Sequence, residues 1–201
     1  MNDYVLRRLP ARQGHFLLES GYHTDLWLTL DSLFVSPRDL APIIDTLAGK
    51  LKRHDATAVC GPFQGGAFLA HALATVLGLD FYFSQPVPSK VGADLFGAEY
   101  QLPADLRTRV SGHRIALVDD VISAGSSVRA TAGALVAADA SIVVVGTLFV
   151  LGRIALDHFR DLGIPVESLG QGEFNLWQPS TCPLCGNRIP LEDLIHRERV
   201  V

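Results

Sequence analysis

Two adjacent carboxylates, and a loop of small residues just beyond them, are the part of this sequence best suited to chemistry. The carboxylates belong to Asp119 and Asp120, and the loop reads Ser123-Ala124-Gly125-Ser126-Ser127. Serine hydroxyls and free backbone N–H groups in such a turn can bind a phosphate, and a helix that begins there adds the positive end of its dipole. The carboxylates would repel a phosphate, so they suit hydroxyl groups, a metal ion or a developing positive charge. Together these residues predict a site for a ribose 5-phosphate.

The flanking residues indicate which elements hold this stretch. Ile115 to Val118 is wholly apolar, which is typical of a strand buried on both faces of a parallel sheet. A helix is predicted from about Val128 to about Ala138. The plainer alternative is an ordinary strand, turn and helix, with the aspartates capping the helix at the surface. That alternative does not require the acid pair and the serine loop to adjoin in this order.

This order of residues resembles the signature with which type I phosphoribosyltransferases bind phosphoribosyl pyrophosphate (PRPP). In it, four hydrophobic residues precede two acidic ones and a Ser/Thr-x-Gly-x-Ser/Thr loop. The resemblance implies that Asp119 and Asp120 bind the 2- and 3-hydroxyls of the ribose. They would also stabilise positive charge as the anomeric carbon loses pyrophosphate, while residues 123–127 hold the 5-phosphate. The similarity covers roughly residues 14–170 and is closest to the orotate phosphoribosyltransferases.

A second glycine-rich loop, Gly61-Pro62-Phe63-Gln64-Gly65-Gly66, follows the short apolar run 57–60. In the family this loop holds pyrophosphate, so Phe63, Gln64 and Gly65 are the predicted pyrophosphate contacts. Orotate enzymes usually carry Gly-Pro-x-x-Lys-Gly here. The loop of this chain has no lysine, and because the amide of Gln64 brings no charge, weaker pyrophosphate binding is expected. The alternative is a purely structural turn between a strand and a helix.

The long segment from Gln85 to Gly112 has weak periodicity, and compact domains rarely keep such a loop without a function. The resemblance makes it the catalytic loop, where orotate enzymes carry a lysine and a His-Gly pair that reach the pyrophosphate from a neighbouring subunit. Here Lys90 is the only lysine, and no His-Gly occurs. Lys90 is therefore the predicted pyrophosphate contact of this segment; the alternative is a lysine in solvent.

The base side of the site is predicted from the amino terminus and from one arginine. Leu18-Glu19-Ser20-Gly21, followed by Leu26-Trp27, resembles the segment that covers the base in orotate enzymes, where a lysine stands in place of Glu19. Trp27 and Arg153 are accordingly the predicted base contacts. The alternative for Arg153 is that it only begins a helix.

Cys182-Pro183-Leu184-Cys185-Gly186 has the spacing of half a zinc site. A tetrahedral Zn²⁺ needs two further ligands. The candidates are His15, His23, His196, Cys60 or a partner chain. The alternative is two reduced cysteines in a turn. Any Zn²⁺ bound by Cys182 and Cys185 is expected to be structural, because the pair lies outside the predicted αβ core.

Short apolar runs alternate with helical segments along the chain. Strands are expected at 26–30, 57–60, 80–83, 115–118, 141–150 and 164–169, and helices at 37–53, 67–77, 128–138 and 153–162. Ser36-Pro37 predicts the start of the first helix, and Gly78 the end of the second. The alternation predicts an α/β fold, a central parallel sheet flanked by helices that is Rossmann-like, as in type I phosphoribosyltransferases. The expected parts are an N-terminal hood (1–35), a core (36–170) and a C-terminal Cys-x-x-Cys extension (171–201).

Composition limits the classes of protein to consider. The 201 residues suffice for one α/β domain with additions, and 48% hydrophobic with 19% charged residues indicates a globular chain. A net charge of −4 argues against non-specific binding of nucleic acid. We expect no membrane span, because the longest apolar runs are too short for one. A cytoplasmic protein is expected, because no signal-like segment opens the chain and three cysteines do not form a secreted disulfide framework.

The sequence therefore predicts a transferase that moves ribose 5-phosphate from PRPP to a nitrogenous base, orotate or a similar pyrimidine, with release of pyrophosphate. The resemblance implies that Mg²⁺ binds with PRPP and that the chain forms a homodimer. One alternative is a regulatory protein of the same fold that binds PRPP or a nucleotide with little or no transfer; Gln64, Glu19 and the sparse basic residues of the long loop favour it. Another is a zinc-stabilised interaction protein that uses residues 171–201 as its contact surface.

Overall fold

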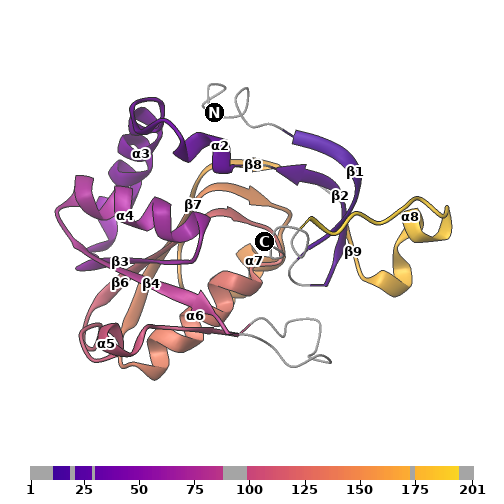
Figure 1. The fold of residues 1–201 in the computed structure, drawn as a ribbon. Coiled ribbons are helices and arrows are strands. Elements are labelled where there is room, and N and C mark those ends of the chain that lie inside the picture. The colour runs from indigo at the N-terminus through magenta and orange to yellow at the C-terminus, as the bar shows by residue number, and fades with distance from the viewer. Residues whose placement is uncertain (1–10, 19–20, 29, 88–98, 173–174, 195–201) are drawn as a thin grey trace.

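The computed structural model describes residues 11–18, 21–28, 30–87, 99–172 and 175–194, and its centre is a six-stranded sheet (Figure 1). The strands lie in the order β5-β4-β3-β6-β7-β8. Their bounds are β3 Ala58–Pro62, β4 Asp80–Pro86, β5 Tyr100–Gln101, β6 Arg114–Ile122, β7 Ser141–Leu151 and β8 Val166–Gly172. All neighbouring pairs are parallel except β4 and β5, which are antiparallel. The predicted α/β fold with a central parallel sheet is confirmed.

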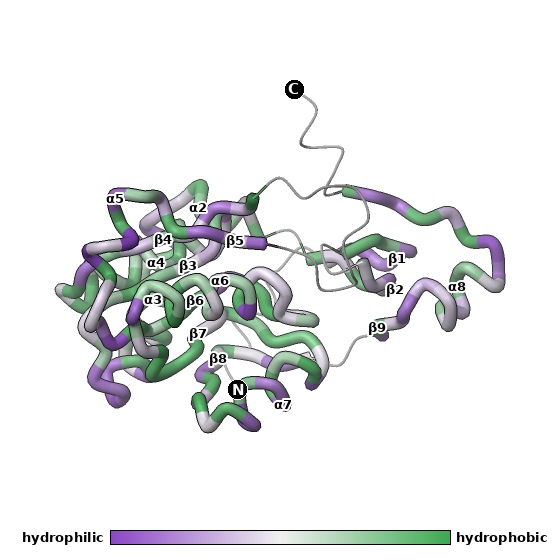
Figure 2. Tube along the Cα trace, turned by 90° about the horizontal axis from the view of Figure 1, so that it is seen from below, coloured by the Kyte–Doolittle hydropathy of each residue, from purple (hydrophilic) through white to green (hydrophobic). Residues whose placement is uncertain are grey.

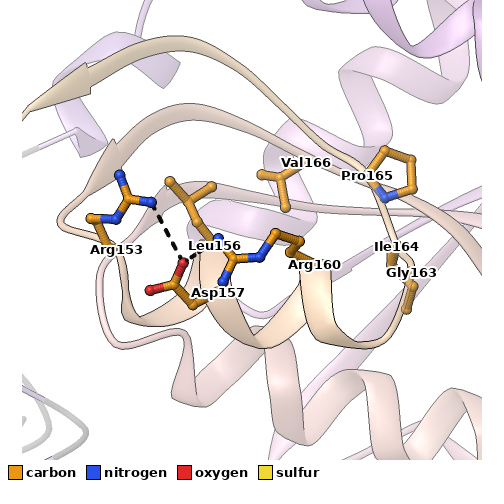
Figure 3. Close-up of a pocket in the computed structure, with 8 residues that line it drawn as sticks. All are labelled: Arg153, Leu156, Asp157, Arg160, Gly163, Ile164, Pro165 and Val166. Carbon is orange, nitrogen blue, oxygen red and sulfur yellow. Dashed lines mark ion pairs between the residues drawn. The ribbon is translucent and has the colours of Figure 1, made fainter.

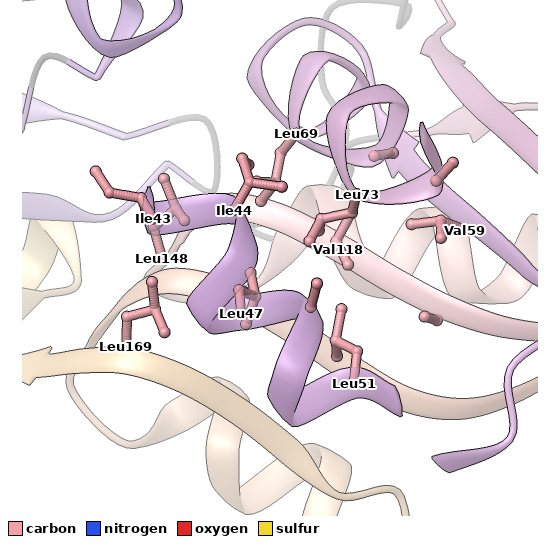
Figure 4. Packing of buried hydrophobic residues seen from close by; sticks show 14 of the residues in the cluster. Ile43, Ile44, Leu47, Leu51, Val59, Leu69, Leu73, Val118, Leu148 and Leu169 are labelled. Atoms are coloured by element: carbon pink, nitrogen blue, oxygen red, sulfur yellow. The ribbon is translucent and has the colours of Figure 1, made fainter. Parts of the chain in front are cut away.

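Helices cover both faces of this sheet. The face with α3 (Pro37–Leu51) and α4 (Gly65–Leu77) packs around Leu47, Leu69 and Leu73, as Figure 4 shows. The opposite face carries α6 (Ser126–Ala137) and α7 (Ile154–Asp161). Shorter helices are α2 (Asp31–Phe34), η1 (Lys52–His54) and α5 (Ala104–Arg107). Because both faces are covered, the central strands are apolar on both sides, which is why they read as continuous apolar runs.

Local signals in the sequence set the ends of the first two long helices. The hydroxyl of Ser36 accepts a hydrogen bond from the Asp39 N–H, and Pro37 is the first residue of α3. Gly78 ends α4 with a φ of 67°. Both predictions are confirmed.

The predicted bounds around the acid pair need correction. β6 does not end at Val118 but continues through both aspartates to Ile122, because its pairing with β7 persists as far as Val150. Likewise α6 begins at Ser126 rather than at about Val128, so two of the serines lie in its first turn. The long segment after β4 is also less irregular than expected, since β5 and α5 lie within it.

A second, smaller sheet joins the two ends of the chain. It consists of β1 (Ala11–Leu17), β2 (His23–Leu28) and β9 (Leu176–Trp177), all antiparallel, and is followed by η2 (Pro179–Thr181) and α8 (Pro183–Gly186). Figures 1 and 2 both show this sheet and α8 beside the core rather than within its layers. None of the helices in the described ranges has the length and apolar character needed to cross a bilayer.

Candidate active site

A cavity of about 230 Å³ lies where the carboxyl ends of β3 and β6 meet. It is lined by Pro62, Phe63, Gln64, Gly65, Tyr100, Asp119, Asp120, Val121 and Ser127. The chain leaves β3 toward β4 on one side and leaves β6 toward β7 on the other, so the strand order reverses between them. Ligands of open α/β sheets bind at this kind of reversal point. The structure thus brings the acid pair and the first glycine-rich loop into one cavity.

The two carboxylates occupy opposite faces of the sheet, because consecutive residues of a strand alternate. Asp119 lies on the α6 side, where the hydroxyl of Ser127 donates to its Oδ2 at 2.8 Å. The backbone N–H of Asp120 donates to the Asp119 Oδ1 at 3.0 Å. The Val121 N–H donates to the Asp120 Oδ1 at 2.8 Å. These bonds fix the acid pair in place before any ligand arrives.

The environment of Asp119 disfavours its negative charge. Its side chain is buried, and burial, followed by the neighbouring negative charge of Asp120, raises its pKa well above the usual range. The hydrogen bond from Ser127 lowers the pKa, but by less than the two opposing effects. A buried carboxylate close to a second, partly buried one is typical of functional sites rather than of stabilising ones.

The loop after β3 lies directly against the acid pair. A Cβ added at Gly65 would collide with the Oδ2 of Asp120, and one added at Gly66 would lie 2.7 Å from the Oδ1 of Asp119. A side chain at either position would therefore displace the loop or the acid pair. α4 begins at Gly65, which lines the cavity, and the first helical hydrogen bonds run from the N–H groups of Ala67 and Phe68 to the Gln64 carbonyl oxygen. The peptide bond between Phe63 and Gln64 is cis.

The serine loop leads into the first turn of α6, where an anion can bind. Gly125 has a φ of 79° and precedes the first residue of α6, a conformation that favours glycine. Within the described residues, the buried Oγ of Ser126 has no hydrogen-bond partner. The Oγ of Ser127 is already bonded to Asp119. Ser123 is partly buried and Ala124 is buried beside them.

The two predicted base contacts do not line this cavity. Arg153 lines a separate cavity of about 480 Å³ along α7 and the start of β8, and its guanidinium pairs with Asp157 at 3.7 Å (Figure 3). Trp27 lies on β2, with its ring centroid 5.9 Å from that of Phe16. Lys90 and Glu19 fall outside the described residues.

The cavity also includes residues that the sequence did not single out. Tyr100 reaches it because β5 pairs with β4, with Tyr100 opposite Pro86. A strand of two residues carries no periodicity, so no local signal identifies it. Val121 could have been found, since it directly follows the acid pair.

A second cluster forms at the small sheet. The ligand atoms of His15, His23, Cys182 and Cys185 all lie within 4.8 Å of one another, so this group could hold a metal ion. Of the other candidates, Cys60 is buried in β3, and His196 falls outside the described residues.

Comparison with known proteins points to one family. The chain is 30% identical over 182 residues to the orotate phosphoribosyltransferase of Thermotoga maritima, covering 90% of this chain and 89% of that protein. No family model matches the chain.

Solved structures agree on the fold. The orotate phosphoribosyltransferase of Aeropyrum pernix superimposes with a TM-score of 0.63 at 21% identity, over 80% of this chain and 87% of that one. The adenine phosphoribosyltransferase of Rhodothermus marinus superimposes with a TM-score of 0.67 at 18% identity, over 85% of this chain and 97% of that one. With the acid pair and the two loops around one cavity, the sequence match establishes that the chain belongs to the orotate phosphoribosyltransferase family.

Proposed function

We propose that the protein transfers ribose 5-phosphate from PRPP to orotate and releases pyrophosphate. The observation that carries this proposal is the single cavity lined by both Asp119 and Asp120 and the glycine-rich loop after β3. Two anionic groups of PRPP flank its ribose, and two helix N-termini flank the acid pair. The orotate phosphoribosyltransferase of Thermotoga maritima, 30% identical to this chain, supports the choice of base.

In the proposed reaction the bond between the anomeric carbon and pyrophosphate breaks, its electron pair leaves with pyrophosphate, a bond from that carbon to a ring nitrogen of the base forms, and the proton of that nitrogen is lost to water. Asp119 and Asp120 accept hydrogen bonds from the 2- and 3-hydroxyls of the ribose. Because the ribose carbon becomes positive as pyrophosphate leaves, fixed negative charge nearby favours the transition state more than the ground state. The hydrogen bonds from Ser127 and from the backbone hold the Asp119 carboxylate in place for this step.

The phosphates of PRPP are assigned to the two helix starts. The 5-phosphate takes the loop 123–127, where Ser126 has a buried hydroxyl without a partner in the described residues. The pyrophosphate, which enters as its Mg²⁺ complex, takes Phe63, Gln64 and Gly65 at the start of α4. Lys90 remains a predicted pyrophosphate contact, and Trp27 and Arg153 remain predicted base contacts. The similarity to orotate enzymes does not favour the alternative of a regulatory protein that only binds PRPP.

The direct test is an assay of pyrophosphate release. The protein is incubated with PRPP, Mg²⁺ and one base from a panel of orotate, uracil, adenine and hypoxanthine. We expect release with orotate and little with the purines. The variant carrying both Asp119→Asn and Asp120→Asn should lose about 10²-fold or more in kcat. PRPP binding without release for any base would reject the transferase, and unchanged PRPP binding by the double variant would reject the site.

The single variant Asp119→Asn should be more stable than the wild type at neutral pH. The raised native pKa means that the native carboxyl holds its proton to a higher pH than the unfolded one. The Asp119 carboxyl therefore contributes fully to stability below its pKa in the unfolded chain, which is about 4. This contribution is lost as the pH rises through its pKa in the native protein. Asparagine has no proton to lose and can still bond to Ser127 and to the Asp120 N–H.

Urea unfolding measures this difference. We expect the variant to gain about 0.5–2 kcal/mol at pH 8, and less at pH 5. Asp45→Asn, on the exposed side of α3, is the control for the loss of a surface carboxylate and should gain much less at pH 8. A gain that is the same at both pH values would contradict the assigned cause.

A methyl group at the loop should disrupt the site. Gly65→Ala forces either the loop or the Asp120 carboxylate to move, because the new Cβ would overlap that carboxylate. We expect kcat/KM for PRPP to fall about 10²-fold or more, since displacing a site by about 1 Å costs that much. Gly133→Ala in α6 is the matched control: its Cβ would meet nothing within 4 Å, and activity should persist. Full activity of Gly65→Ala would show that the loop is not part of the site.

A lysine at position 64 should strengthen PRPP binding. Gln64 is exposed at the cavity and brings no charge, whereas Gln64→Lys adds a cation beside the assigned pyrophosphate position. We expect the KM for PRPP to fall about 3- to 10-fold, with a steeper dependence on salt. Gln171→Lys makes the same charge change at an exposed position of β8 and should leave the KM unchanged. Equal effects of the two substitutions would remove Gln64 from the pyrophosphate site.

A further inference from the structure

Four metal-ligating side chains meet at the small sheet, apart from the residues that line the active-site cavity. His15 comes from β1, His23 from β2, and Cys182 and Cys185 from the segment that contains α8. We propose that these four side chains bind one Zn²⁺ ion, in a closed structural site that fastens the C-terminal segment to the N-terminal hairpin.

Four of the distances between the ligand atoms are close to those of a tetrahedral site. Zn–N bonds of about 2.0–2.1 Å and Zn–S bonds of about 2.3 Å place neighbouring ligand atoms of a tetrahedron about 3.3–3.8 Å apart. The Cys182 Sγ lies 3.4 Å from the His15 Nε2, and the Cys185 Sγ lies 3.8 Å from the same atom. The Cys185 Sγ is 3.3 Å from the His23 Nδ1, and the two histidine nitrogens are 3.0 Å apart. The two nitrogens must separate slightly to admit the ion, and the remaining pairs of ligand atoms lie within 4.8 Å of one another.

Hydrogen bonds alone account poorly for this cluster. The Nδ1 of His15 lies 2.8 Å from the carbonyl oxygen of Ile189, which can only accept, so this nitrogen carries the proton. The Nε2 of a neutral His15 then has a single lone pair, although His23, Cys182 and Cys185 all converge on it. A metal ion at the centre uses that lone pair and the other three ligand atoms at once. The hydrogen bond from the His15 Nδ1 to the Ile189 carbonyl is also of the kind that orients a metal-binding imidazole.

Apolar packing does not explain how this region is held together. Among the described side chains of residues 11–28 and 175–194, the buried hydrophobic ones are Phe16 and Cys182, whereas His15 and His23 are both buried. Two backbone hydrogen bonds join Glu192 to β1. The ion pair of Glu192 with Arg12, at 3.1 Å, is largely exposed and contributes little. Small units without a core of their own usually rely on a metal or a disulfide.

The ligand set indicates both the metal and its role. Two thiolates with two imidazoles are typical of structural Zn²⁺, and with four protein ligands no position is left open for a substrate. Binding would tie together residues far apart in the sequence, which is how a structural metal stabilises a fold. The site acts independently of the proposed transfer reaction, since none of its four ligands lines the active-site cavity.

Metal analysis of the purified full chain is the first test. We expect about one Zn²⁺ per chain in the wild type and about tenfold less or lower in Cys185→Ser. Cys185 is the exposed ligand, so its exchange for serine causes the least repacking. Cys60→Ala is the matched control: it removes the third cysteine, which is buried in β3, and should keep its Zn²⁺. A wild type without Zn²⁺, or a Cys185→Ser protein with full Zn²⁺, would overturn the proposal.

Chelation and cobalt substitution test the site in the unmodified protein. Removing Zn²⁺ should lower the melting temperature of the wild type by roughly 5–10 °C and leave Cys185→Ser unaffected. Co²⁺ added to the metal-free wild type should give the visible bands of tetrahedral coordination and the near-ultraviolet bands of thiolate ligands. Absence of the thiolate bands would overturn the proposal even if the variant fails to fold. A disulfide between Cys182 and Cys185 in the freshly purified protein would also overturn it.

Discussion

The close contact between the acid pair on β6 and the glycine backbone that begins α4 is the constraint on which the site depends. Gly65 lies against Asp120 and Gly66 against Asp119, so the start of α4 approaches the acid pair with no side chain of its own in between. The reversal of strand order at this point leaves room for a ligand. The starts of α4 and α6 both reach the same edge of the sheet, and their positive ends face the negative charge of the pair.

The position of the acid pair serves the proposed reaction but lowers the stability of the fold. Burial of Asp119 beside Asp120 disfavours the charged form, yet a negative charge is what the developing cation of the proposed reaction needs. Ser127 partly offsets the cost by donating to Asp119. The surrounding sheet, packed on both faces by the apolar sides of helices, supplies the stability that the acid pair removes, and Figure 4 shows the face with α3 and α4. The carboxylates are thus held rigidly in a position that they would not keep on an exposed loop.

Much of the core could be predicted from local sequence signals. The features that were not predicted depend on pairing between segments that are far apart in the sequence. Ser36 and Gly78 set the ends of the helices next to them, and the apolar runs mark the strands in which they lie. These elements could therefore be predicted from the sequence. The true end of β6 depends on its pairing with β7, and the place of Tyr100 depends on β4. The meeting of His15 with Cys182 likewise arises from the return of the chain to the N-terminal hairpin. Cysteine spacing alone showed half of that cluster.

The most direct test of the account is a crystal structure of the protein with PRPP and Mg²⁺. The 5-phosphate should lie in the loop 123–127, the ribose hydroxyls on Asp119 and Asp120, and the pyrophosphate at the start of α4. That result would place all three groups of PRPP around the contact between Gly65 and the acid pair. PRPP bound elsewhere, for example in the cavity lined by Arg153 and Arg160, with Asp119 and Asp120 left without ligand, would contradict the account.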